Sequence, residues 1–194
     1  MKKLNETTVL KTPVFDVVSK EFEGTPFKPV GLNCPDWVMV VVLDRFSRTI
    51  VVKQTRWGCE DKTIEFPCGT VEPNEDPRTA AIRELKEETG FIKDIDESEL
   101  TEIACINPNP AYFNNKMHIY HYGIERIPVE NGFGKQNLDE NEDCQMFVAP
   151  LEEVAKDIGS HGMGLAALGA LYRLRHLQLR SQILGGIYGS RNES

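Results

Sequence analysis

The sequence lacks paired cysteines, long apolar runs and an excess of positive charge. Its five cysteines are odd in number, and no two of them form a Cys-x-x-Cys pair. This pattern argues against a disulfide framework or a zinc site, and it favours reduced thiols in a cytoplasmic protein. The cysteines are Cys34, Cys59, Cys68, Cys105 and Cys144.

The apolar runs are short. The longest useful run, Trp37 to Leu43, is far too short to span a bilayer, and it predicts a buried strand instead. No apolar stretch follows the lysines near Met1, so we expect no signal peptide.

The charge is negative, with a net value of −8 and a pI of about 5.1. This argues against a general nucleic-acid surface. We therefore expect no nucleic acid as a partner, and the short apolar runs argue against a membrane. The 194 residues are 40% hydrophobic and 27% charged, which suits one globular domain with a substantial core.

The strongest local pattern lies between Gly69 and Phe91. Asp76 followed by Pro77 predicts a helix start, because Asp caps free backbone N–H groups and Pro is tolerated at the first helical position. Gly90 predicts the helix end, because glycine accepts the left-handed conformation that ends helices.

Three acids share one face of this expected helix. Glu84 stands three residues before Glu87 and four before Glu88, and these spacings stack side chains on one face. Like charges repel there, and a divalent cation such as Mg²⁺, which prefers oxygen ligands, would remove the repulsion. Arg83, four residues before Glu87, can hold one acid in place. The opposite, core-facing side consists of Ala81, Ile82 and Leu85.

The same segment resembles the Nudix box, which implies an α/β fold, the α/β/α sandwich of mixed sheets. It also implies hydrolysis of a nucleoside diphosphate linked to another group. Two or three Mg²⁺, with Mn²⁺ as the other choice, would be held by Glu84, Glu87, Glu88 and the backbone carbonyl of Cys68. Arg83 would orient the glutamates. The matching positions are Gly69, Glu75, Arg83-Glu84-Leu85, Glu87-Glu88 and Gly90-Phe91.

Upstream of the box, the strand that ends at Arg56 and the turn from Glu65 to Gly69 resemble those of ADP-sugar pyrophosphatases. That resemblance implies that Arg56 lies over the nucleotide and its diphosphate. Arginine suits this role because its guanidinium is planar, charged and able to bind two oxygens at once. Glu65 would accept hydrogen bonds from the base or the sugar.

Downstream, Pro110 resembles in kind the proline loop of ADP-ribose hydrolases, and His118 resembles the histidine of the Glu-x-x-His pattern that follows that loop. Ala111 and Lys116 depart from that pattern, so the sugar stays open. Pro110 and Tyr112 are candidate substrate contacts. Tyr112 and its neighbour Phe113 can either stack on a base or pack in the core.

The acidic segment 138–143 resembles the loop that supplies a general base in ADP-ribose pyrophosphatases. By that resemblance Glu140 is the base and Glu142 a metal ligand, although the two roles could be exchanged. Arg83 and Glu87 complete the catalytic group.

The resemblance therefore implies metal-dependent hydrolysis of ADP-ribose or another ADP-sugar to a nucleoside monophosphate and a sugar phosphate. The alternatives are GDP-sugars or dinucleoside polyphosphates as substrates, and a non-catalytic nucleotide-sugar sensor. A third class, isoprenoid diphosphate isomerases, needs a catalytic cysteine in its own motif. Cys68 offers its carbonyl, and its thiol needs no role.

The chain divides into N-terminal strands in residues 1–60, a Nudix domain in 36–181 and a flexible tail in 182–194. The N-terminal segment resembles the extra N-terminal sheet of ADP-ribose pyrophosphatases. That resemblance implies a homodimer, with or without exchanged strands. A loop is expected from Gly24 to Pro35. Strands are expected at Val14–Glu23, Trp37–Leu43, Thr49–Gln54, Thr63–Phe66, Glu99–Ile106, Lys116–Ile124 and Phe147–Val148, and helices at Leu151–Ile158 and Leu165–Leu179.

Overall fold

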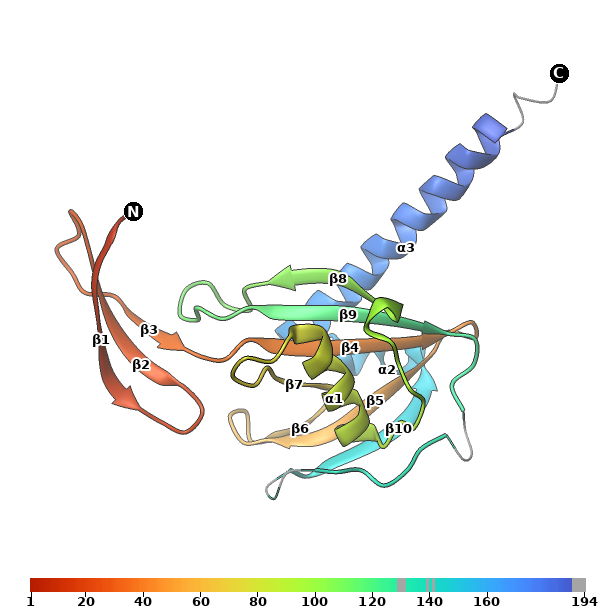
Figure 1. Ribbon diagram of the computed structural model, residues 1–194, viewed down its shortest axis with the longest axis horizontal. Helices are drawn as coiled ribbons and strands as arrows, with labels where there is room; N and C mark the ends of the chain where they lie inside the picture. Colours follow the sequence, from red (N-terminus) through yellow and green to blue (C-terminus); the bar gives the residue numbers. More distant parts are fainter. Residues whose placement is uncertain (129–131, 139, 141, 190–194) are drawn as a thin grey trace.

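The computed structural model describes residues 1–128, 132–138, 140 and 142–189, with side chains up to His176. A small antiparallel sheet stands beside the main body of the molecule (Figure 1). Its strands, in the order β1-β2-β3, are β1 (Lys3–Lys11), β2 (Asp16–Phe22) and β3 (Val30–Asn33).

The main body is built on a mixed sheet with the path β10-β5-β4-β9-β8. β4 and β9 run parallel, and the other pairs are antiparallel. Two further strands belong to the same sheet but lie off this path: β6 pairs with β5, and β7 pairs with β4. The strands are β4 (Trp37–Asp44), β5 (Arg48–Arg56), β6 (Asp61–Glu65), β7 (Cys68–Thr70), β8 (Leu100–Ile106), β9 (Met117–Ile124) and β10 (Cys144–Pro150).

Helices cover both faces of this sheet, with α1 (Pro77–Thr89) on one side and α2 (Leu151–Ile158) and α3 (Gly162–Gly189) on the other (Figure 1). Alternate residues of β4 explain the two layers: Val38, Val40 and Val42 pack in the core under α1. Met39 and Val41 pack in the second core with the other helices. The sheet is buried on both faces, and the predicted α/β/α sandwich is confirmed.

The start and end of α1 follow the sequence. The Asp76 side chain accepts a hydrogen bond from the Arg78 N–H at 2.8 Å, and Pro77 opens the helix. Gly90 ends it at a φ of 67°, and its N–H donates to the Lys86 carbonyl at 2.8 Å. Both predicted ends are confirmed.

Each predicted strand overlaps an observed one, but three strands were not predicted individually. The expected loop from Gly24 to Pro35 contains β3, so that expectation is wrong over Val30–Asn33. β1 is mostly polar and exposed, and β7 has three residues. Such strands have no apolar alternation to reveal them, since their pairing comes from neighbouring strands.

The C-terminal helix is longer than expected. It begins at Gly162 and continues through Gly189, whereas the sequence predicted a helix only over Leu165–Leu179 and a flexible tail from residue 182. Residues 190–194 of that tail lie outside the described residues, and the division into N-terminal segment, domain and tail stays a prediction. Within the described part of the chain, none of the helices has the length and apolar character needed to cross a membrane.

We predict that Gly90→Ala destabilises the fold strongly. A Cβ at Gly90 would lie 2.4 Å from the Gly134 carbonyl oxygen, in addition to the strain of the positive φ. We expect a loss of about 3 kcal/mol in the free energy of unfolding, measured by urea denaturation.

Gly24→Ala is the matched control, because Gly24 has a φ of +74° and a Cβ at this residue would meet nothing within 4 Å. It should lose only about 1 kcal/mol, the cost of the left-handed backbone alone. Equal losses in the two variants would contradict the steric argument.

Candidate active site

The Glu84 carboxylate lies directly against the backbone of Gly69. A Cβ at Gly69 would stand 2.1 Å from Glu84 Cδ and 2.2 and 2.3 Å from its two oxygens. Gly69 pairs with Val38 on the buried strand β4, so it is held by the sheet. Only glycine leaves room for a helix carboxylate at this point.

Arg83 binds the acids around this contact. Its Nε and Nη2 donate to the two oxygens of Glu75 at 2.9 and 3.0 Å. Its Nη1 donates to Glu84 at 2.8 Å and to Glu87 at 2.9 Å, and Nη2 also donates to the Thr70 carbonyl at 2.9 Å. The guanidinium thus holds the box loop and the helix together, which is the geometry expected of an orienting residue.

Glu88 is the most buried of the three α1 glutamates, with 2% of its surface exposed. Burial raises the pKa of its carboxyl to about 8, and the charges of Glu84 and Glu142 act in the same direction. The Cys68 N–H, which donates to Glu88 Oε2 at 2.9 Å, opposes this rise. The Cys68 backbone therefore positions Glu88, and the predicted metal role of its carbonyl stays a prediction.

These acids fit a divalent cation. Burial also raises the pKa of Glu84, with Glu87 and Glu142 adding to the effect and Arg83 opposing it. Both raised pKa values show that the negative charges are poorly compensated by the protein alone. The donors are all hard carboxylate oxygens, which suit Mg²⁺ or Mn²⁺.

The acidic segment 138–143 is brought to the same place by the residues before it. The Asn137 N–H donates to the Glu87 carbonyl at 2.9 Å, and the Gln136 side chain donates to the Glu88 carbonyl. Glu142 is close enough to raise the pKa values of Glu84 and Glu88. Glu142 therefore belongs to the site electrostatically.

The structure also describes Glu140 and Asp143 of this segment. Glu140 is exposed, and its role as a base stays a prediction. Asp139 and Asn141 lie outside the described residues. Asp143 anchors the end of the segment, since it accepts hydrogen bonds from Thr55 at 3.0 Å and Lys62 at 2.9 Å.

Arg56 and Glu65 form a two-pronged ion pair. Arg56 Nε and Nη2 donate to the two Glu65 oxygens at 2.8 and 2.7 Å. The Thr63 hydroxyl donates to Glu65 Oε1 at 2.5 Å, and the Glu65 side chain is only 2% exposed. Glu65 therefore holds the Arg56 side chain in position. The contact of Glu65 with substrate stays a prediction.

A cavity of about 350 Å³ lies between Arg56 and the box turn. Trp37 lines it, a residue that the sequence placed only in a buried strand. The missed signal is the position of Trp37 at the start of β4, where a strand leaves the core and its side chain is half-buried. The cavity is lined by Val14, Trp37, Val38, Arg56, Cys68, Gly69, Thr70, Met117 and Met163.

The proline loop approaches this cavity through Phe113, whose ring packs edge-on against Trp37 at 5.9 Å between centroids. Tyr112 is 61% exposed, and its carbonyl accepts a hydrogen bond from the Leu32 N–H at 2.7 Å. Pro110 is also exposed. Phe113 therefore takes the packing role, and Tyr112 and Pro110 stay predicted substrate contacts.

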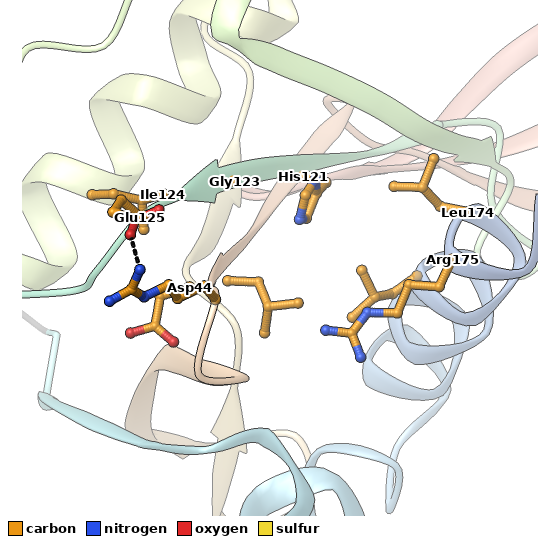
Figure 2. A pocket seen from close by; sticks show the side chains of 10 residues that line it. Asp44, His121, Gly123, Ile124, Glu125, Leu174 and Arg175 are labelled. Atoms are coloured by element: carbon orange, nitrogen blue, oxygen red, sulfur yellow. Dashed lines mark ion pairs between the residues drawn. The ribbon is translucent and has the colours of Figure 1, made fainter. Parts of the chain in front are cut away.

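A second cavity, of about 330 Å³, lies at the opposite end of β4 (Figure 2). Figure 2 shows Asp44 at the end of this strand, with His121 from β9 and Arg175 from α3. Asp44 is bound by Arg48 at 2.9 and 2.7 Å and accepts the Ile127 N–H at 3.2 Å. These contacts give Asp44 a structural role, away from the carboxylates of α1.

Comparison with known proteins places the carboxylates of α1 and the box turn within a known domain family. The family model described as the NUDIX domain matches residues 35–165. The chain is 29% identical to an ADP-ribose pyrophosphatase of Bacillus subtilis over 191 residues, which cover 94% of this chain and 98% of the relative. It is 41% identical to an ADP-sugar pyrophosphatase of Mus musculus over 134 residues, 69% of this chain and 55% of the relative.

Among solved structures, the crystal structure of an ADP compounds hydrolase is similar with a TM-score of 0.66 and 24% identity. The match covers 91% of this chain and 95% of that one. This similarity supports the α/β/α sandwich.

We predict that the Arg56–Glu65 pair stabilises the fold in a pH-dependent way. Burial acts to raise the pKa of Glu65, but the hydrogen bonds and charge of Arg56, with help from Thr63 and Cys68, outweigh it and lower the pKa to about 2. A lowered pKa contributes stability above the unfolded value, about 4.5, and this contribution is lost as the pH falls from there toward 2.

Glu65→Gln should therefore lower the free energy of unfolding at neutral pH, and its difference from the wild type should shrink below about pH 4.5. Urea denaturation across this range measures it. Asp143→Asn is the control, because Asp143 is an exposed acid paired with Lys62 and should change stability little. A difference that stays constant down to pH 3 would contradict the role of the ion pair.

Proposed function

The chain belongs to the Nudix family of hydrolases, and on that premise we propose that it hydrolyses the pyrophosphate bond of a nucleoside diphosphate sugar. ADP-ribose or another ADP-sugar is the proposed substrate, and the products are a nucleoside monophosphate and a sugar phosphate. The observation that carries this proposal is the cluster of three carboxylates, from Glu84, Glu87 and Glu88, beside a cavity that Arg56 lines.

The cavity suits the nucleoside end of such a substrate. Trp37 and Met117 supply apolar surface, and Arg56 supplies a planar cation held flat by Glu65. A base can stack on an aromatic or guanidinium face, and the same cation attracts a diphosphate. The names of the related pyrophosphatases support an adenine nucleotide, while Ala111 and Lys116 leave the sugar open.

Nudix hydrolases generally use divalent metals, and we propose Mg²⁺, with Mn²⁺ as the other choice. Glu84, Glu87, Glu88 and Glu142, with the carbonyl of Cys68, would hold it. Such a cation would neutralise the diphosphate and favour the ionisation of an attacking water.

The remaining steps fall to residues of the chain. Glu140 would accept the proton of the attacking water at its carboxylate, a contribution of about 10²–10⁴-fold. Arg83 would keep Glu84 and Glu87 in register with Gly69 through the contacts described above. Arg56 would position the diphosphate.

We also propose a homodimer formed through the N-terminal sheet. Leu4, Val9 and Leu10 of β1 are 58%, 64% and 57% exposed. A sheet this small depends on a hydrophobic face or on packing against another element for its stability. A second copy of this sheet would supply that surface. The five cysteines are free, which supports our expectation of a reducing, cytoplasmic location.

We predict turnover of ADP-ribose or another ADP-sugar in the presence of Mg²⁺, and its loss in Glu88→Gln. Removing a charged metal ligand should cost about 3–5 kcal/mol of transition-state stabilisation, which is a rate loss on the order of 10²–10⁴-fold. The measurement is product formation from ADP-ribose, ADP-glucose, GDP-mannose, UDP-glucose, NADH and diadenosine polyphosphates.

Glu152→Gln, an exposed acid on α2, is the matched control and should retain full activity. Near-normal turnover by Glu88→Gln at saturating Mg²⁺ would sink the metal assignment. Preference for GDP-sugars or dinucleoside polyphosphates would contradict the proposed ADP-sugar substrate and assign one of those classes instead. No turnover at all would favour a nucleotide-sugar sensor.

The dimer is tested by replacing Leu4 and Leu10 together with lysine. The wild type should sediment as a dimer, and the double variant should shift toward the monomer because two charges would enter the apolar contact. Leu165→Lys on α3, which is 60% exposed in the wild type, is the control and should stay dimeric. A monomeric wild type at micromolar concentration would contradict the proposal.

A further inference from the structure

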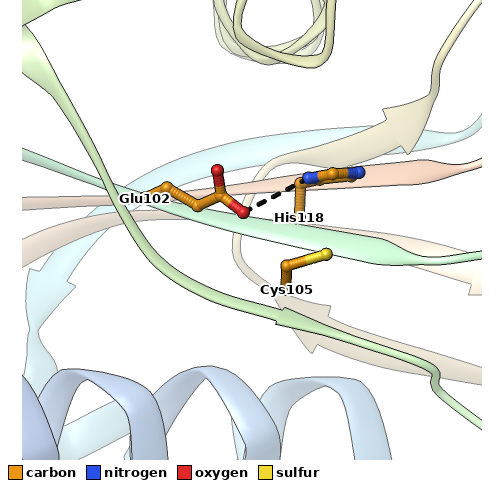
Figure 3. A group of neighbouring side chains, drawn as sticks. All are labelled: Glu102, Cys105 and His118. Carbon is orange, nitrogen blue, oxygen red and sulfur yellow. Dashed lines mark hydrogen bonds and ion pairs between the residues drawn. The ribbon is translucent and has the colours of Figure 1, made fainter.

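Three side chains of different chemistry meet on the edge of the main sheet. Cys105 of β8 lies opposite His118 of β9 in the strand register, and Glu102 stands nearby on β8. A carboxylate oxygen of Glu102, the Cys105 sulfur and a ring nitrogen of His118 all lie within 4.8 Å of one another. Figure 3 shows the Glu102 carboxylate directed at the imidazole and the Cys105 thiol beside it.

The imidazole of His118 is held between two carboxylates. Its Nδ1 lies 3.4 Å from Glu102 Oε1, and its Nε2 lies 3.7 Å from Asp36 Oδ2. Asp36 is itself fixed, since its Oδ1 accepts the Lys116 N–H at 2.7 Å. The His118 ring stacks on Tyr120 with 11° between the planes, and only 15% of the His118 side chain is exposed.

This arrangement is typical of a metal-binding histidine. One ring nitrogen faces potential ligands, and the other faces an outer carboxylate that sets the tautomer and the ring orientation. Here Nδ1 faces Glu102, and the Asp36 carboxylate lies on the other side of the ring, 3.7 Å from Nε2, which is an ion-pair distance longer than a hydrogen bond.

We propose that Glu102, Cys105 and His118 bind one transition-metal ion of the zinc class, with water in the remaining position. Sulfur and imidazole nitrogen suit Zn²⁺ and disfavour Mg²⁺, which prefers oxygen donors. Cys105 binds as the thiolate, and its proton passes to the solvent. The sequence argued against zinc because no cysteines are closely paired, but the strand register supplies the missing nitrogen and oxygen donors.

This site is separate from the carboxylates of α1. His118 pairs with Val38 on β4, and Val38 pairs with Gly69 on β7, so one strand lies between the two groups. Asp36, beside His118, contacts the turn before α1, because its carbonyl accepts the Val71 N–H at 2.8 Å. The proposal does not depend on the proposed hydrolysis.

Cobalt(II) titration of the full chain tests the proposal, because a cobalt–thiolate bond gives a charge-transfer absorption that carboxylate sites lack. The wild type should show this band, and stoichiometric Zn²⁺ should displace it. Cys105→Ser should abolish the band, whereas His118→Gln and Glu102→Gln should weaken Zn²⁺ binding measured by chelator competition.

Asp36→Asn separates the outer carboxylate from the ligands. Its amide oxygen can still accept the Lys116 N–H, so the fold is retained while the charge beside Nε2 is lost. Zn²⁺ affinity should fall by about 10–100-fold.

Cys59→Ser, which changes another exposed thiol, is the matched control and should keep the band. Glu88→Gln should keep it too, which distinguishes this site from the acidic one. Thermal unfolding without metal confirms that each variant folds. Absence of the band in the wild type, its persistence in Cys105→Ser or its loss in Cys59→Ser would overturn the proposal.

Discussion

The close approach of Glu84 to Gly69 is the constraint on which the site depends. The Glu84 carboxylate fills the space that any side chain at Gly69 would need. This contact exists because β7 is paired to β4 while α1 packs through Ala81 and Leu85 on the same sheet. The helix, the turn and the sheet therefore meet at one point, and the acids are placed there by packing.

The same packing creates an electrostatic conflict. Glu84 and Glu88 are carboxylates withdrawn from water, and their raised pKa values show that the charged forms are disfavoured. Arg83 and the Cys68 N–H relieve part of the conflict and also fix the geometry. Sites of this kind sacrifice stability for a preorganised arrangement, and a bound cation would restore the balance.

The sheet carries two donor groups of contrasting chemistry. Around Gly69 the ligands are carboxylates from one helix, which favour hard cations. Around His118 a thiol, an imidazole and a carboxylate come from two strands, which favour softer ones. Asp36, which lies beside His118, accepts a backbone hydrogen bond from Val71 in the turn before α1, so the surroundings of the two groups are in contact.

Local signals predicted much of the fold. Asp76 and Gly90 set the ends of α1 because capping depends on neighbouring residues. A continuous apolar run revealed the buried strand β4, and alternation revealed β9. The sequence did not predict the polar β1, the short β7 or the start and end of α3, because their conformation depends on pairing or packing with distant segments.

By itself, the sequence determined the face shared by Glu84, Glu87 and Glu88, since helical spacing is local. Only the tertiary structure decided that Arg56 is held by Glu65, that Trp37 lines the cavity and that Cys105 meets His118. Those partners lie far apart along the chain or on different strands. Strand register and sheet order bring them together, and neither can be read from residue spacing alone.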